Sequence, residues 1–230
     1  MKFINTFRQL WSQRSKPDTP ALIALILIII LDFLLSDALT VEILPPLIDR
    51  VLFVILLTMI LFVFTCWLFS LSTFIRKIVI SILMIVAAKL AFGVFLLVFT
   101  LMEQKGDSDA IPLILDSFIL WTTNFLISAV WYWFIDGGGS KARERPGEYQ
   151  PDFWFLLQSE DHNIPIWRNN DKWVPGFFDY LFLAFNTSVA LSPTDTQIIS
   201  VRAKILTMIQ SITSLIVLVI LAARAVNILK

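Results

Sequence analysis

The chain is short of the side chains that build metal, haem and thiol chemistry. It has one cysteine, Cys66, and one histidine, His162, in 230 residues. A single cysteine excludes a disulfide within the chain and a thiolate metal cluster. A single histidine excludes a haem with two His ligands and a metal site built from several histidines of one chain. No cofactor is therefore expected.

Neither sign of charge is in excess, because 18 Lys and Arg residues balance 18 Asp and Glu residues. A nucleic-acid-binding role consequently has no electrostatic support. The sequence also shows no paired catalytic carboxylates and no Cys-His pair, so no enzyme activity is predicted.

Apolar side chains are abundant, at 57% of the residues. A soluble domain of this size could not hide so much apolar surface, because its exterior needs polar cover. Several uninterrupted apolar segments reach the ~20 residues with which a helix spans the hydrocarbon core. The partner that they imply is the lipid bilayer, in the inner or plasma membrane of a cell.

The apolar segments predict an all-α, polytopic membrane protein with five transmembrane helices and a short re-entrant or sixth helix near residues 177–191. The predicted full spans are residues 21–35, 47–74, 78–102, 111–134 and 196–229. Residues 177–191 are too few for an ordinary span. They form either a half-helix or a crossing of a thinned bilayer, and both alternatives stay open at this point.

The positive charges orient the chain. Placing the N-terminus in the cytoplasm puts most Lys and Arg residues of the connecting segments inside, as the positive-inside rule requires. The inside set is Lys2, Arg8, Arg14, Lys16, Arg76, Lys77, Lys141, Arg143, Arg145, Arg168 and Lys172, and the outside set is Arg50 and Lys105. The sequence therefore predicts a cytoplasmic N-terminus.

The segment from Asp179 to Thr187 resembles the entry of the pore helix in the two-helix pore module of potassium channels. Asp195 falls where that family has an acidic residue after its filter, and residues 222–226 resemble the end of its inner helix. The filter itself would fall at residues 190–194, which contain no glycine and include Pro193. Because proline restricts the backbone of a filter built from successive carbonyls, the resemblance implies a degenerate filter without potassium selectivity.

Three motifs resemble a family of uncharacterised bacterial polytopic membrane proteins, some of them ion-channel-like. The motifs are Trp131 to Gly139, Phe185 to Asp195 and Ala223 to Leu229. This resemblance covers most of the chain and implies fold and topology rather than an established reaction.

Composition and the resemblances together divide the chain into four regions. Residues 1–19 form a cytoplasmic amphipathic N-terminus, and residues 20–136 a four-helix membrane region. Residues 137–176 form a hydrophilic loop. Residues 177–230 hold a pore-helix-like segment, a Ser-Pro-Thr-Asp loop and a final long helix.

Polar side chains gather at the end of the short apolar segment and in the turn after it. They are Asn186, Thr187, Ser188, Ser192, Thr194 and Asp195. In a symmetric homo-oligomer their oxygen atoms would form a ring at a pore for an inorganic ion. The alternative is turn and cap chemistry, with Thr194 or Asp195 capping the last helix.

Thr207, Gln210 and Ser214 are spaced by three and four residues, so they share one face of the last helix. This face either lines a water-filled route or joins helices through side-chain hydrogen bonds.

Lys89 lies in the middle of the third predicted span, and Asp32 and Asp116 lie in the first and fourth spans. A charge inside a membrane is costly unless it is paired or faces water. The two acids are therefore candidate partners of Lys89, in a pair that either fixes helix packing or takes part in transport.

These observations predict a channel-like, weakly selective pore protein that assembles as a homo-oligomer. The alternative is a non-conducting structural or accessory membrane protein that binds lipid or partner proteins.

Overall fold

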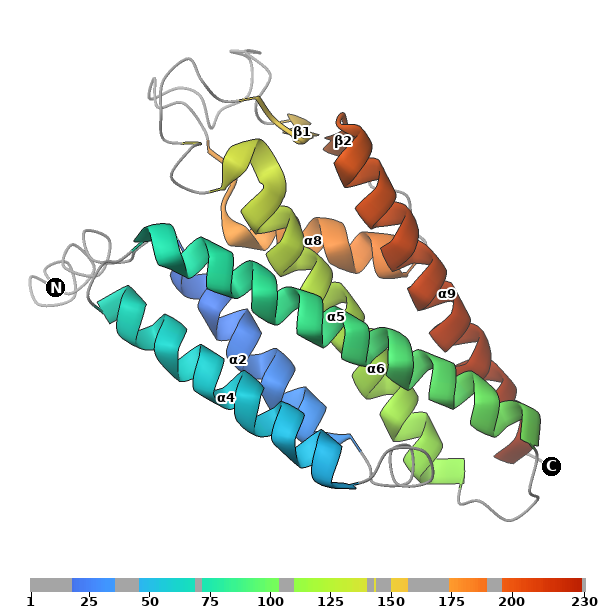
Figure 1. The fold of residues 1–230 in the computed structure, drawn as a ribbon. Coiled ribbons are helices and arrows are strands. Elements are labelled where there is room, and N and C mark those ends of the chain that lie inside the picture. The colour runs from blue at the N-terminus through green and yellow to red at the C-terminus, as the bar shows by residue number, and fades with distance from the viewer. Residues whose placement is uncertain are drawn as a thin grey trace, which may run out of the picture.

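The computed structural model describes residues 18–35, 46–68, 72–103, 110–139, 143, 150–156, 174–189 and 196–228. Its helices are α2 (Thr19–Leu34), α4 (Pro46–Leu68), α5 (Ser72–Glu103), α6 (Ala110–Ile135), α8 (Phe177–Ser188) and α9 (Val201–Ile228). A turn, η1 (Asp136–Gly138), follows α6, and the strands β1 (Phe153–Phe155) and β2 (Thr196–Ile198) form a two-stranded ribbon. Figure 1 shows the long helices side by side, with α8 oblique to them and the ribbon at one end.

Three segments are long and apolar enough to cross a membrane. They are Lys77–Phe99 in α5, Ile114–Gly138 in α6 and its following turn, and Val201–Ala223 in α9. Two shorter apolar helical segments are Thr19–Leu34 and Phe53–Val63. The helical fold expected from the sequence is thus confirmed, and a count of five transmembrane helices stays a prediction.

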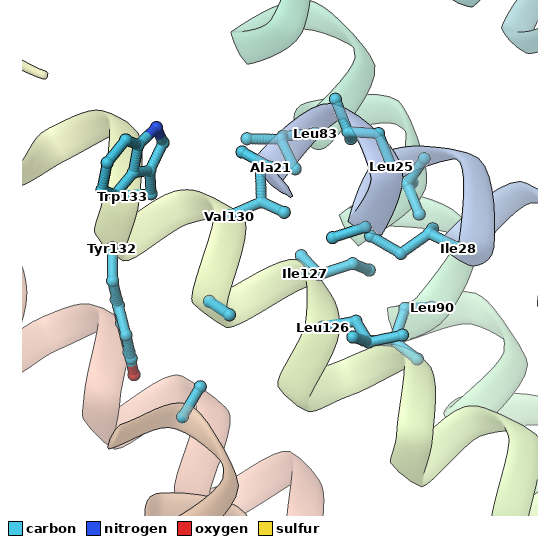
Figure 2. Close-up of a cluster of buried hydrophobic side chains, with 14 of the residues drawn as sticks. Ala21, Leu25, Ile28, Leu83, Leu90, Leu126, Ile127, Val130, Tyr132 and Trp133 are labelled. Atoms are coloured by element: carbon cyan, nitrogen blue, oxygen red, sulfur yellow. The ribbon is translucent and has the colours of Figure 1, made fainter. Parts of the chain in front are cut away.

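α6 is the central helix. Of its membrane-length segment 61% is buried inside the protein, compared with 44% for α5 and 28% for α9. It packs against α2, α5, α8 and α9. Figure 2 shows the apolar contact on its α2 and α5 side, which includes Ala21, Leu25, Ile28, Leu83, Leu90, Leu126, Ile127 and Val130. Close approach of α5 is possible because residue 93 is glycine: a Cβ there would lie 3.0 Å from Leu120.

The last helix begins later than the sequence predicted. We expected it from residue 196, but Thr196–Ile198 form β2 and α9 begins at Val201. These residues are extended because they pair antiparallel with β1. Strands of three residues carry no periodic signal, so the pattern of the sequence could not reveal the ribbon.

The cap of α9 also differs from our expectation. The Oγ of Ser200 accepts a hydrogen bond from the backbone N–H of Ala203 at 3.2 Å, which is the usual bond of a capping serine. Thr194 and Asp195, the caps predicted from the sequence, lie outside the described residues.

The boundary between the second and third spans is displaced as well. Arg76 and Lys77 were expected to separate them, but both lie within α5, which begins at Ser72 after α4 has ended at Leu68. Arg and Lys are good helix formers, so a basic pair need not interrupt a helix.

Candidate functional site

α8 begins at one end of α6 and finishes part-way along it. At its start, the ring of Phe177 lies edge-on to Trp133, with the centroids 6.1 Å apart. At its end, the indole N–H of Trp121 donates to the backbone oxygen of Ser188 at 3.4 Å. At 1.5 Å per residue, the two tryptophans are separated by roughly 18 Å along α6. α8 therefore penetrates to the middle of the bundle.

The chain after α8 returns to the end from which it came. Ile199, just beyond β2, donates its backbone N–H to the backbone oxygen of Asp152 at 2.9 Å. Arg202, in the first turn of α9, donates to the backbone oxygen of Ile135 at 3.3 Å, and Ile135 is the last residue of α6. Segment 177–200, of which residues 190–195 lie outside the described residues, thus begins and ends at one end of the bundle.

Gln210 of α9 closes the deep end of α8. Its Nε2 donates to the backbone oxygen of Ala184 at 2.5 Å and to the Oγ of Ser188 at 2.7 Å. Its Oε1 accepts a hydrogen bond from the hydroxyl of Tyr132, on α6. The last carbonyl groups of a helix have no partner within that helix. Trp121 supplies such a donor to the last residue, Ser188, and Gln210 adds a donor to Ala184, one turn earlier.

Asn124 of α6 continues this polar network. Its Nδ2 donates to the backbone oxygen of Gln210 at 3.1 Å and to the Oγ of Ser214 at 2.7 Å. Its own backbone oxygen accepts from the Oγ of Ser128 at 2.8 Å. All of these side chains are buried. The mid-depth network, which we define as Asn124, Tyr132, Ser188, Gln210 and Ser214, therefore links α6, α8 and α9.

The three lining-helix candidates, Thr207, Gln210 and Ser214, share one face of α9, as predicted. That face is buried inside the chain. Gln210 and Ser214 belong to the mid-depth network. Thr207 is buried, and its Oγ1 donates to the backbone oxygens of Ala203 and Lys204 in its own helix, at 3.0 and 2.9 Å. Within this protomer the face joins helices. A role in lining a water-filled route stays a prediction.

Three of the six pore candidates lie at the end of α8. Thr187 and Ser188 are buried, and the Oγ1 of Thr187 donates to the backbone oxygen of Leu183 at 2.8 Å. Asn186 is half-buried, and its side chain makes no hydrogen bond with any residue that the structure describes. The remaining candidates lie outside the described residues: Ser192, Thr194 and Asp195.

Asp136, a residue that the sequence did not single out, holds the start of α8. Its Oδ2 accepts a hydrogen bond from the hydroxyl of Tyr180, in the first turn of α8, at 2.5 Å. Its Oδ1 accepts from the backbone N–H groups of Asp152 and Phe153, at 2.6 and 3.2 Å. The carboxylate is fully buried and therefore depends on these donors.

Arg143 neutralises this buried carboxylate. Its side chain is 1% exposed, and its Nη1 lies 3.8 Å from the Oδ2 of Asp136. The same Nη1 donates to the backbone oxygens of Trp133 and Asp136, at 3.0 and 3.1 Å. Its Nη2 has no hydrogen-bond partner among the described residues. The guanidinium instead lies 4.0 Å from the centre of the Trp133 ring and 5.2 Å from that of Tyr180, at distances typical of cation–π contacts.

Asp152 holds the exit of the same segment. Arg202 donates to its carboxylate from Nε at 2.6 Å and from Nη2 at 2.5 Å, and the backbone N–H of Gly137 donates at 3.0 Å. Burial alone would raise the pKa of Asp152, but hydrogen bonds from Arg202, Ser200 and Gly137 and the charge of Arg202 outweigh it and lower the pKa. We call Asp136 and Asp152 the carboxylate clasp, because they fix both ends of segment 177–200 to the end of α6.

Glycines make the turn of the clasp possible. Gly137, Gly138 and Gly139 have φ values of 55°, 91° and 99°, which other residues rarely adopt. This turn follows α6 directly and presents the N–H of Gly137 to Asp152. Its sequence, which we predicted as part of a hydrophilic loop, thus forms an ordered corner.

The lowered pKa of Asp152 predicts a pH-dependent contribution to stability. A carboxylate whose pKa is lower in the folded state stabilises that state above its unfolded pKa, about 3.9, and loses this effect as the pH falls through the folded value. Asp152→Asn should therefore be less stable than the parent at pH 7, and the gap should narrow below about pH 4. Denaturant titrations of both proteins across that range measure it; a gap that widens in acid would contradict the assignment.

Lys89, in the middle of the membrane-length segment of α5, pairs with Asp32. Its Nζ lies 2.7 Å from the Oδ2 of Asp32, and the two side chains are 18% and 12% exposed. Asp116, the other candidate partner, is buried in α6. The pair links α2 to α5, which is the packing role considered from the sequence; a transport role stays a prediction.

Removing one member of this pair should be costly and removing both much less so. Lys89→Met leaves Asp32 without its cation, so we expect a loss of about 3 kcal/mol in the free energy of unfolding. The double variant D32L/K89M should recover most of that loss, because both charges of the pair are removed together. Unfolding in SDS–detergent mixtures measures both; equal losses in single and double variants would show that the charges are not coupled.

Other cavities and clusters in the described residues offer little chemistry. A crevice of about 300 Å³ between α2 and α4 is lined by apolar side chains alone, among them Phe33 and Phe53. No group of three or more His, Cys, Asp or Glu side chains in the described ranges could hold a metal ion. The polar groups that organise the structure are therefore the mid-depth network, the carboxylate clasp and the Lys89–Asp32 pair.

Comparison with protein-family models, with curated proteins and with solved structures finds no match to this chain. The two family resemblances drawn from sequence motifs therefore stay predictions, and the function has to be argued from the geometry.

Proposed function

We propose that the chain is a multi-pass membrane protein in which α6, α8 and α9 form a channel-like pore module for weakly selective permeation of an inorganic ion. The observation that carries this proposal is the path of segment 177–200, which reaches the middle of the bundle and returns to the same end of α6. In a bilayer such a path is a re-entrant half-helix. Non-helical backbone at membrane depth is tolerated only where protein buries it or water borders it.

The proposed topology follows from this path. α2, α4, α5, α6 and α9 would be five transmembrane helices, and α8 would dip in from the side that holds the N-terminal end of α2. Asp18, directly before α2, accepts a hydrogen bond from Trp133 near the end of α6 at 3.0 Å, so these two ends share a side. We assign that side to the cytoplasm because of the Lys and Arg distribution.

We propose from the sequence alone that the Ser-Pro-Thr-Asp loop borders the pore, because residues 190–195 lie outside the described residues. Its polar candidates are Ser192, Thr194 and Asp195. Several copies of the chain would pack around the pore. Contacts between copies would cover α9, which is largely exposed in a single chain. This is why the proposal includes a homo-oligomer.

Asn186 supports a polar environment beside α8. An amide without hydrogen-bond partners costs several kcal/mol, roughly 2–7 depending on the reference state, when it is moved into an apolar medium. Its neighbours on the helix surface, Phe182 and Phe185, are 51% and 41% exposed. At mid-depth the Asn186 amide therefore needs water or a polar group that lies outside the described residues, in this chain or in another copy.

A second function is favoured by a different observation. Every member of the mid-depth network finds its partner within one chain, which is the arrangement expected of helix packing in a non-conducting scaffold. The alternative proposal is therefore an accessory membrane protein that binds lipid or partner proteins.

Ion flux separates the two proposals. The purified protein in liposomes should carry Na⁺, K⁺ or Cl⁻ above the leak of empty vesicles. Asn186→Leu should lower that flux about tenfold, equivalent to ~1.4 kcal/mol in the barrier. The matched control is Thr65→Val on α4, whose hydroxyl bonds within its own helix at 2.7 Å, and its flux should be unchanged. Flux equal to empty liposomes for all three ions would overturn the pore and favour the scaffold.

A further inference from the structure

The end of the bundle that carries the clasp exposes apolar side chains. They belong to the ribbon, the start of α8 and the start of α9, which lie close together at this end in Figure 1. The most exposed are Trp154, Leu156, Val174, Phe178, Ile199 and Val201, at 37% to 75%. An aromatic and aliphatic surface beside a membrane-length helix is typical of the headgroup region of a bilayer.

Two cations flank this surface on α9. The side chain of Arg202 is 60% exposed, and Lys204 is exposed too. At 100° per residue they lie on opposite sides of the exposed stripe that begins with Val201. Lys204 has no acidic partner among the described residues, and the bonds of Arg202 to Asp152 use Nε and Nη2 and leave Nη1 available.

We propose that the exposed α9 cations Arg202 and Lys204, together with the exposed ribbon side chain Trp154, bind the headgroups of anionic phospholipids around this end of the bundle. Charge complementarity carries the choice of partner, because two exposed cations and an interfacial tryptophan match a phosphate group above acyl chains. The inference rests on the membrane placement in the proposed function and does not require conduction.

The position of Arg202 gives such binding a consequence for the fold. The guanidinium that would meet the lipid phosphate also holds Asp152, at 2.5 and 2.6 Å. Asp152 in turn accepts the N–H of Gly137 in the turn after α6, and its backbone oxygen accepts that of Ile199 beyond β2. A headgroup bound to Arg202 would therefore affect how firmly Asp152 holds the C-terminal end of segment 177–200.

The test places a fluorophore on position 197, which is exposed and lies opposite Trp154 in the ribbon, in the C66A/Q197C protein. In a phosphatidylcholine bilayer, spin-labelled phosphatidylglycerol should quench it at lower mole fractions than spin-labelled phosphatidylcholine does. Lys204→Gln should weaken that preference about fivefold, the effect of one cation near an anionic surface. Lys204→Arg should retain the preference for phosphatidylglycerol, which would show that the position tolerates substitution when the charge is kept.

The matched control is Lys77→Gln, which removes an exposed cation at the start of α5, on the same side of the bundle but on another helix. It should leave the preference unchanged. Equal quenching by both lipids, or equal effects of the two Lys→Gln variants, would overturn the inference. Preference for phosphatidylglycerol in a protein without ion flux would overturn the pore instead and leave the inference standing.

Discussion

Asp136→Asn should destabilise the protein by about 3 kcal/mol. The substitution keeps the size of the side chain and removes the negative charge beside Arg143. That cation is 1% exposed and cannot turn to water without leaving its contacts with Trp133 and Tyr180. An uncompensated buried charge is the reason for the cost.

Removing the cation as well should restore stability. In the double variant D136N/R143M neither charge of the buried pair remains, so most of the loss should be recovered. The free energy of unfolding in SDS–detergent mixtures measures the parent, both single variants and the double variant. Asp179→Asn is the control, because Asp179 is a partly exposed acid at the start of α8. Its Oδ2 accepts a hydrogen bond from the backbone N–H of Gly176. A loss no larger than that of the control would contradict the buried pair.

Gln210→Met should cost about 2 kcal/mol. Methionine keeps the length of the side chain, so the loss comes from hydrogen bonds rather than from a cavity. The backbone oxygen of Ala184, the Oγ of Ser188 and the hydroxyl of Tyr132 each lose the hydrogen bond that Gln210 makes with them. Such bonds contribute on average about 0.6 kcal/mol each in a membrane protein and up to ~1.7.

The same substitution at an exposed position controls for its chemistry. Gln197, on the exposed face of β2, should tolerate methionine with a change within about 0.5 kcal/mol. Limited proteolysis reports the second expected effect of Gln210→Met, because α8 without its deep partner should be cleaved sooner. Parent-like stability and cleavage in Gln210→Met would show that the mid-depth network does not hold α8.

Periodicity and hydropathy made the helices predictable. Apolar runs marked α2 and α6 within a few residues, and the shortness of the run near 177–191 pointed to the half-length α8. The lone Lys89 in an apolar segment pointed to an acidic partner, which the structure identifies as Asp32. Each of these signals is local. The apolar pattern of a helix and the presence of a charge within it can both be recognised in one continuous segment of sequence.

The clasp depends on contacts between distant segments and was therefore missed. Asp152 meets Arg202, and Asp136 meets Tyr180, only because the chain folds back after α8. Each of these residues stands in a polar or mixed stretch, where an acid or a cation ordinarily faces solvent. The one hint was the glycine run after Asp136, because consecutive glycines at a helix end are typical of a tight turn.

Side-specific labelling tests the re-entrant path of segment 177–200 most directly. Cys66→Ala provides a background for single cysteines at the exposed positions Gln150 and Gln197, which precede and follow α8, and at Lys105, between α5 and α6. A membrane-impermeant maleimide applied to sealed vesicles of known orientation should label positions 150 and 197 from the same side and position 105 from the other. Labelling of 150 and 197 from opposite sides would mean that α8 crosses the membrane, and would contradict the account.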